Sequence, residues 1–264
     1  MTKKNRFQEL CEAGQVGNHP LRHLAETDST NRVAMEQGRK GGQTGLIIVA
    51  DHQSQGRGRL DKKWLSSAGD GLYFSVILRP LLALDELARI TLAAGAAVAE
   101  ALQPLLAEMV MLKWPNDIIV GNRKCGGILS ESDISNIDRP LVILGIGLNL
   151  QRPEEGFPAE IADRAGALAD YSSEFIEPGV LLEELIAKID HVLTELEQQG
   201  WPAIRKRWQQ RDITMARRMT WVTAKGEVIN GVSQGIDEQG LLYIRDDSGT
   251  RHEVLSGDVQ LQRH

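Results

Sequence analysis

Residues 51–64 read DHQSQGRGRLDKKW and carry the strongest structural signal in the chain. They follow Leu46–Ala50 (LIIVA), whose β-branched side chains are typical of a strand. At Gly56-Arg57-Gly58-Arg59, glycine lets the backbone approach a ligand closely, and arginine brings planar, permanently charged donors to the same place. The segment therefore predicts a loop that wraps around a phosphate or a carboxylate. A solvated hairpin tip is the open alternative.

The sequence around this loop predicts alternating strands and helices. Apolar residues recur at helical spacing over Asp85–Met109, where small residues at 93–97 indicate close packing on a sheet. A second amphipathic helix is expected over Leu181–Gln199, with Gly200 as its stop. Residues 152–178 are expected to form a loop region. Further strands are expected at Leu72–Arg79, Gly127–Ile134 and Leu141–Leu148.

The pattern changes after about Ile213, where short alternating segments are separated by turn residues. We expect an α+β domain over residues 1–213, followed by a small all-β domain over residues 214–264 that forms an antiparallel barrel. The expected strands of this second domain are Met219–Ala224, Val228–Ile236, Leu241–Arg245, Arg251–Leu255 and Val259–Leu261.

The composition is that of an ordinary globular protein. Hydrophobic residues make up 42% and charged residues 25% of the 264 residues, so extensive disorder is not expected. The net charge of −6 argues against a nucleic-acid binder, and no apolar stretch approaches the roughly 18 residues of a membrane span. The six histidines show no paired metal spacing. A polar N-terminus and only two cysteines, Cys11 and Cys125, lead us to expect a cytoplasmic protein.

Two short motifs place a lysine beside turn-forming residues. Residues 113–117 read KWPND, in which Asn116 and Asp117 could hold nucleotide phosphates through Mg²⁺, although an ordinary β-turn uses the same residues. Residues 123–129 read RKCGGIL, and Lys124 stands before a Gly-Gly step that enters a strand. A lysine held there could reach a developing negative charge; a solvated surface lysine is the alternative.

Two further motifs combine polar residues with an expected element end. Ser29-Thr30-Asn31 is typical of a helix N-cap, and a helix N-terminus also receives anions. Gly145–Asn149 (GIGLN) ends an apolar strand, but Leu150 stands where a dinucleotide fingerprint needs glycine. We expect these glycines to let a ligand lie on the strand, with Asn149 at the rim.

Taken in order, the motifs STN, QxxGRGR, WxS, LYFS, KWPND, KxGGILxE and GIGLN resemble the catalytic core of biotin–protein ligases. Together with the small C-terminal barrel, the resemblance covers nearly the whole chain. It implies a mixed-sheet catalytic domain related to class II aminoacyl-tRNA synthetases and lipoate ligases, plus an SH3-like C-terminal β-barrel. Only 28 residues precede Ser29, and a winged helix-turn-helix needs about twice that number. We therefore expect the monofunctional form, without DNA binding.

The resemblance implies a two-step reaction that uses ATP, Mg²⁺ and biotin. Biotin and MgATP form biotinyl-5′-adenylate and pyrophosphate, and the adenylate then acylates a lysine of a biotin carrier domain, usually of acetyl-CoA carboxylase. The resemblance assigns catalysis to Lys124, Arg57 and Arg59, and Mg²⁺ binding to Asp117. The implied biotin-binding residues are Ser29, Thr30, Asn31, Gln53, Gly56, Arg57, Gly58, Arg59, Lys124, Gly127, Leu129 and Gly145. The implied ATP- and adenylate-binding residues are Arg59, Lys62, Trp64, Asn116, Asp117, Lys124 and Asn149.

The sequence departs from the family pattern at one place. After GRGR the family commonly continues with Arg-Gly-Arg, whereas Leu60, Asp61 and Lys62 stand here. Lys62 supplies a point charge but no bidentate fork, and Asp61 repels phosphate. The effect of this change on retention of the adenylate is left open.

Two other functions stay open. One is a lipoate or octanoate ligase on a related scaffold, although the GRGR loop and the small barrel favour biotin. The other is a biotin-binding regulator without catalysis, against which Lys124 and the KWPND motif argue. The expected partner is a biotin carrier domain, and no membrane is expected. The chain could be a monomer or a homodimer, with Leu141–Leu148 as a candidate sheet edge.

Overall fold

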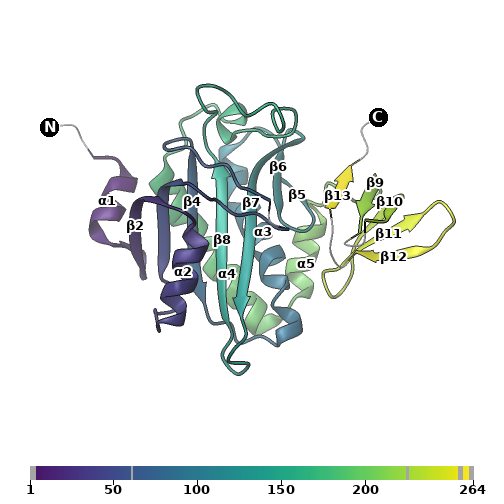
Figure 1. The fold of residues 1–264 in the computed structure, drawn as a ribbon, viewed down its shortest axis with the longest axis horizontal. Helices are drawn as coiled ribbons and strands as arrows, with labels where there is room; N and C mark the ends of the chain where they lie inside the picture. Colours follow the sequence, from purple (N-terminus) through teal and green to yellow (C-terminus); the bar gives the residue numbers. More distant parts are fainter. Residues whose placement is uncertain (1–3, 61, 224–225, 255–257, 262–264) are drawn as a thin grey trace.

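The structure, a computed structural model, describes residues 4–60, 62–223, 226–254 and 258–261 (Figure 1). Its α-helices are α1 (Arg6–Ala13), α2 (Thr30–Arg39), α3 (Arg89–Leu102), α4 (Pro178–Gln199) and α5 (Pro202–Gln209), and its 3₁₀ helices are η1 (Leu84–Glu86), η2 (Gln103–Leu105) and η3 (Leu168–Tyr171). The strands of the larger sheet are β1 (Gln15–Val16), β2 (His19–Thr27), β3 (Ile47–Gln53), β4 (Gly71–Leu78), β5 (Met111–Lys113), β6 (Asp117–Val120), β7 (Arg123–Asp133) and β8 (Leu141–Asn149).

The larger sheet is mixed, as the sequence predicts. Over the described residues its order is β1-β2-β3-β4-β8-β7-β6-β5. β2 and β3 run parallel, with Thr27 beside Gln53, and the other neighbours are antiparallel. The expected sheet edge at Leu141–Leu148 is wrong, because β8 lies between β4 and β7. Its long apolar run is the mark of a strand buried inside a sheet rather than at its edge.

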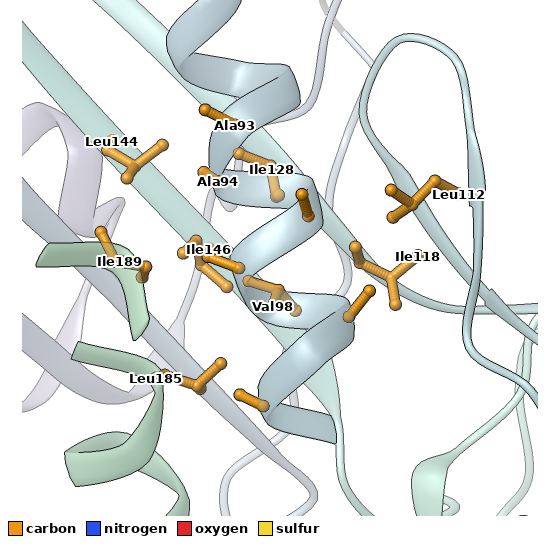
Figure 2. Packing of buried hydrophobic residues seen from close by; sticks show 14 of the residues in the cluster. Ala93, Ala94, Val98, Leu112, Ile118, Ile128, Leu144, Ile146, Leu185 and Ile189 are labelled. Carbon is orange, nitrogen blue, oxygen red and sulfur yellow. The ribbon is translucent and has the colours of Figure 1, made fainter. Parts of the chain in front are cut away.

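The main core lies on the face of the sheet that α3 and α4 cover. Leu144 and Ile146 of β8 share a buried cluster with Val98 of α3 and Ile189 of α4 (Figure 2). The small residues at 93–97 are all buried in α3, as the sequence predicts, and they let this helix approach the sheet closely. The apolar side of β8 is therefore continuous.

The opposite face of β8 changes its character along the strand. Leu141 and Ile143 pack with Ala34 of α2 in a second buried cluster. Side chains alternate along a strand, so the next two positions on this face are Gly145 and Gly147. The apolar layer under α2 therefore stops where the glycines begin, and the sheet surface beyond it is open to another occupant.

The C-terminal residues form the predicted antiparallel sheet. Its strands are β9 (Arg218–Val222), β10 (Val228–Ile236), β11 (Leu242–Asp246), β12 (Arg251–Val254) and β13 (Asp258–Leu261), in the order β12-β11-β10-β9-β13 over the described residues. Ala224 and Leu255, two expected strand ends, lie outside the described residues. The C-terminal part of the chain contacts the region of the larger sheet, where the Trp114 Nε1–H donates to the Gly240 carbonyl at 3.0 Å.

Several elements differ from the sequence-based expectation. The helix expected over Asp85–Met109 is shorter, because Pro104 has no N–H to continue it and residues 84–86 form a 3₁₀ turn instead. The sequence analysis did not identify α1, β1, β2, β5, β6 or α5. In β2 the burial pattern does not alternate, and only Leu21 is buried, so the strand lacks a period-two signal. Among the described residues, no helix combines the length and the apolar character of a membrane span.

We expect Ile146→Ala to lower the free energy of unfolding by about 2–5 kcal/mol, because it leaves a cavity between the sheet, α3 and α4. Ile137→Ala is the matched control, since Ile137 is 65% exposed and Ile146 is 3% exposed. Urea denaturation followed by circular dichroism measures both. Equal losses in the two variants would show that β8 is not central to the core.

Candidate active site

A cleft of about 1080 Å³ lies over the glycines of β8 and is bounded by the first turn of α2, the glycine-rich segment, the KWPND turn and residues 157–165. It brings together almost all residues that the sequence analysis selected. Those that line it are Ser29, Thr30, Asn31, Gln53, Arg57, Gly58, Arg59, Lys62, Trp64, Asn116, Asp117, Lys124, Gly127, Leu129, Gly145 and Asn149.

One end of the cleft is a buried network of uncharged polar groups. The backbone N–H of Thr30 donates to Gln53 Oε1 at 2.8 Å, and Thr30 Oγ1 lies 3.1 Å from the same oxygen. Ser75 Oγ lies 2.7 Å from Thr30 Oγ1 and 2.6 Å from Asn31 Oδ1. Parallel pairing of β2 with β3 sets this geometry, because it places the start of α2 beside the end of β3. The site can therefore match a ligand that carries both donors and acceptors.

Ser29 and Asn31 play different local roles within the same turn. Ser29 is the N-cap residue of α2, as predicted, but its side chain makes no capping hydrogen bond and its hydroxyl is left at the cleft. Asn31 reaches across the sheet, and a Cβ atom at Gly145 would stand only 2.0 Å from its Oδ1. Gly145 is therefore required so that Asn31 can lie on β8.

Over residues 54–60 and 62–65, the glycine-rich segment is folded back as a short hairpin. The Gly58 N–H donates to the Lys62 carbonyl at 2.7 Å, and the Trp64 N–H donates to the Gly56 carbonyl at 2.8 Å. Gly56 belongs to this pairing and does not line the large cleft, since a Cβ there would lie 2.4 Å from the Trp64 oxygen. Asp61 lies outside the described residues. The sequence left two interpretations of this segment open, a ligand-binding loop and a solvated hairpin tip. The segment does form a hairpin, and Arg57, Gly58 and Arg59 of this hairpin line the cleft.

The indole of Trp64 lies against the face of the sheet where Gly127 of β7 and Gly147 of β8 have no side chains. A Cβ at Gly147 would stand 2.7 Å from Trp64 Cε2, and a Cβ at Gly127 would stand 3.2 Å from Cζ3. Gly127 and Gly147 are paired neighbours on β7 and β8, so together they make a flat seat for the indole. Lys124 Nζ lies 5.6 Å from the centre of the ring, close enough for a cation–π contact.

Basic side chains gather at the other end of the cleft. Lys124 Nζ lies 2.5 Å from Asp117 Oδ1, and Lys113 Nζ lies 3.9 Å from Asp117 Oδ2. The guanidinium carbon of Arg59 lies 5.9 Å from the centre of the Trp114 ring. Asp117 therefore holds two ammonium groups together that would otherwise repel each other.

The two asparagines at this end are held by the backbone. Asn116 Nδ2–H donates to the Ile128 carbonyl at 2.8 Å, so the KWPND turn between β5 and β6 is fastened to β7. Asn149 Nδ2–H donates to the Gly166 carbonyl at 3.0 Å. Both readings of KWPND are therefore compatible: its residues form a turn, and the turn lines the cleft.

Some residues in and around the cleft were given no role by the sequence analysis. Ser75 and Glu131 are the last residues of the motifs LYFS and KxGGILxE, and they contact cleft residues without lining the cleft themselves. The segment at 157–165 was expected to be a loop, but it forms one wall of the cleft. The Lys124 N–H donates to the Arg164 carbonyl at 2.7 Å, which joins this wall to β7. A contact made by backbone atoms does not depend on the side chains of residues 157–165, so their sequence gives no sign of it.

Cys125 follows Lys124 but does not take part in the cleft. Its side chain is fully buried among apolar groups, and burial raises the pKa of the thiol to about 12. The thiol is therefore neutral at physiological pH and packs in the core.

Residues 24–149 match the Biotin/lipoate A/B protein ligase family, and residues 220–262 match the Biotin protein ligase C terminal domain. The chain is 30% identical over 257 residues to a biotin–[acetyl-CoA-carboxylase] ligase of Mycobacterium tuberculosis, covering 95% of this chain and 92% of that relative. It is also 30% identical over 242 residues to the bifunctional ligase/repressor BirA of Bacillus spizizenii, covering 90% of this chain and 74% of the relative.

The structure is similar to that of a biotin protein ligase from Aquifex aeolicus solved in complex with biotin and ATP. The TM-score is 0.79 at 30% sequence identity, and the match covers 94% of this chain and all of that one. The chain therefore belongs to the biotin protein ligase family.

Proposed function

We propose that this protein activates biotin with ATP and transfers it to a lysine of a biotin carrier domain. In the first step the biotin carboxylate attacks the α-phosphorus of ATP, which forms biotinyl-5′-adenylate and releases pyrophosphate. In the second step the lysine amine attacks the acyl carbon, an amide bond forms, and AMP leaves with the electron pair of the broken C–O bond. The amine loses a proton to solvent.

The observation that carries this proposal is the asymmetry of the single cleft described above. One end is a buried network of hydroxyl and amide groups, with a charged pair of Glu131 and Arg57 at its rim, and the other end carries Lys124 and Lys113 around Asp117. Biotin has the same asymmetry, because a neutral ureido ring with one carbonyl and two N–H groups is joined through an apolar tail to a carboxylate. We assign the ureido ring to Ser29, Thr30, Asn31 and Gln53, and the tail to Gly127, Leu129 and Gly145 beside Trp64.

Lys124 is the proposed catalytic cation. The first step brings a carboxylate against a phosphate, so charge must be neutralised where the two anions meet. One lysine charge at ~4 Å with an effective dielectric near 20 contributes ~4 kcal/mol, roughly a thousandfold in rate if it acts fully on the transition state. Arg57 and Arg59 on the hairpin would add planar donors for the carboxylate and the phosphate.

Magnesium fits this site as an ion that arrives with ATP. Mg²⁺ is usually bound through substrate phosphates, water and one or two carboxylates. Asp117 is the candidate carboxylate, but its two oxygens already face Lys124 and Lys113. Among the described residues there is no group of three His, Cys, Asp or Glu side chains that could hold a metal ion. When bound, the ion would neutralise phosphate charge, and Asp117 would still orient Lys124.

The finer structural expectations are part of the same proposal. We place the boundary between the ligase domain and the small β domain at residues 213 and 214, and we take the C-terminal sheet to be an SH3-like barrel. Val259 of that sheet lies at the cleft, so the small domain would help to bind ATP or the carrier. We also propose that the larger domain is related to class II aminoacyl-tRNA synthetases. The protein would be cytoplasmic, and it would be a monomer or a homodimer.

The first experiment is biotin-dependent ATP–pyrophosphate exchange, with lipoate as the competing substrate. We expect exchange with biotin and not with lipoate, and a loss of about a thousandfold in Lys124→Ala. Lys40→Ala is the matched control, because Lys40 also pairs with a carboxylate but lies on the surface at the end of α2. Exchange with lipoate alone would favour a lipoate ligase, and biotin binding without exchange would favour a regulator.

The hairpin arginines are expected to retain the adenylate in the cleft. Arg59→Gly should therefore release biotinyl-5′-adenylate and biotinylate lysines of bystander proteins. Mass spectrometry of a mixture of carrier and unrelated proteins measures this labelling. Background labelling by a variant that still turns over would refute the trapping role of Arg59.

We expect no sequence-selective DNA binding. The net charge of −6 does not favour phosphate contacts. A gel-shift titration against biotin-operon DNA, with biotin and ATP present, tests this expectation. A tight complex that survives competition by unrelated DNA would contradict it.

A further inference from the structure

Glu131 of β7 contacts both the glycine-rich hairpin and the buried polar network of the cleft. Its Oε1 lies 2.9 Å from Arg57 Nη1 of the hairpin. Its Oε2 accepts a hydrogen bond from Asn31 Nδ2 at 2.8 Å. One carboxylate therefore uses one oxygen for the hairpin and the other for the buried polar network.

The contact with Asn31 fixes the direction of the hydrogen bonds in that network. Asn31 Nδ2 faces two acceptors, Glu131 and the Leu129 carbonyl at 3.2 Å, so Asn31 Oδ1 must face Ser75. An amide oxygen only accepts, so the Ser75 hydroxyl proton is directed to Asn31. The Thr30 backbone N–H fixes Gln53 Oε1 as an acceptor in the same way.

With this direction fixed, the network has fewer hydroxyl protons than contacts between oxygen atoms. There are three oxygen–oxygen contacts, which join Gln53 to Thr30, Thr30 to Ser75, and Ser75 to Asn31. Only the two hydroxyl groups of Thr30 and Ser75 carry protons for them. The network is therefore rich in acceptor oxygens and poor in donors, which suits a ligand that brings N–H groups, as a ureido ring does.

The contact with Arg57 fastens the hairpin at its middle. The far end is already anchored, because Ser66 Oγ accepts from the Gln53 N–H at 2.7 Å and lies 3.1 Å from the Gln53 carbonyl. The Arg57 side chain is 51% exposed and that of Glu131 is 26% exposed, so this ion pair lies at the rim of the cleft. It holds the glycine-rich turn beside β7.

We propose that Glu131 is a positioning residue that keeps the hairpin closed through Arg57 and sets the donor and acceptor pattern of the ureido end through Asn31. The second half of this inference rests on the proposed function, and the first half does not. Glu131 would touch neither the reacting atoms nor ATP. Its effect would appear in biotin affinity and in retention of the adenylate.

The sharpest variant is Glu131→Gln, because an amide cannot satisfy both partners. Its oxygen can face Arg57 or Asn31, and its NH₂ group then faces the other donor. Asp133→Asn is the matched control: Asp133 lies two residues away on the same strand and pairs with Arg39 at 2.6 Å, outside the cleft. Both variants lose one negative charge from a partly buried ion pair on β7.

Three measurements separate the roles. Hydrogen exchange in the free protein reports hairpin closure at the amides of Gly58 and Trp64, and we expect about tenfold faster exchange in Glu131→Gln. Calorimetry without ATP should show about tenfold weaker biotin binding. Chase experiments should show faster release of biotinyl-5′-adenylate. Asp133→Asn should behave as the unmodified protein in all three.

The outcomes distinguish this inference from the proposed function. Unchanged hairpin exchange and unchanged biotin affinity in Glu131→Gln would overturn the inference. A wild-type protein that neither binds nor activates biotin would overturn the proposed function, while the exchange measurement would still decide the role of Glu131 in closing the hairpin. Arg57→Gln breaks the same ion pair from its exposed side. It should open the hairpin equally, which guards against a folding defect in Glu131→Gln.

Discussion

The cleft depends on one constraint: β8 must be apolar on one face and nearly bare on the other. Leu144 and Ile146 bury one face under α3 and α4, and this burial fixes the strand in the middle of the sheet. Gly145 and Gly147 leave room on the other face for Asn31 and Trp64 respectively. Any larger residue at either position would meet one of these side chains below van der Waals distance. The packing of the core on one face of β8 therefore fixes the position of the glycines that line the cleft on the other face.

The second requirement is to hold several cations in a small volume. Each of the two best-defined cations is paired with a carboxylate of the sheet, Lys124 with Asp117 and Arg57 with Glu131. Both carboxylates belong to strands of the sheet, Asp117 in the lining of the cleft and Glu131 at its rim, so they set the direction from which the cations approach. Such pairing reduces the repulsion among the basic groups and keeps long, flexible side chains in one place. An incoming phosphate then meets an ordered basic surface.

The sequence predicted the central strands β3, β4, β7 and β8, the C-terminal strands and the helices α3 and α4, although not all of their bounds, because these features are local. Alternation identified the C-terminal strands, and helical spacing identified α4. The motifs also predicted that Ser29, Lys124 and Asn149 belong together through a family resemblance, although they lie far apart in the chain. Local reasoning failed where a neighbour supplies the stability, as in β2, which has one buried residue, and in the wall at 157–165, which is joined to β7 through the backbone.

Leu60 and Lys62, two of the residues at which the sequence departs from the family pattern, lie in the turn of the hairpin. The turn is closed by backbone hydrogen bonds from Gly58 to Lys62 and from Lys62 to Arg59. Leu60 adopts a left-handed conformation with φ of 55°, which costs a non-glycine residue about 1 kcal/mol. The ion pair of Arg57 with Glu131 fastens the same hairpin from outside. Arg57 therefore links closure of the hairpin to the cleft, because the same side chain pairs with Glu131 and lines the cleft beside Arg59 and Lys124.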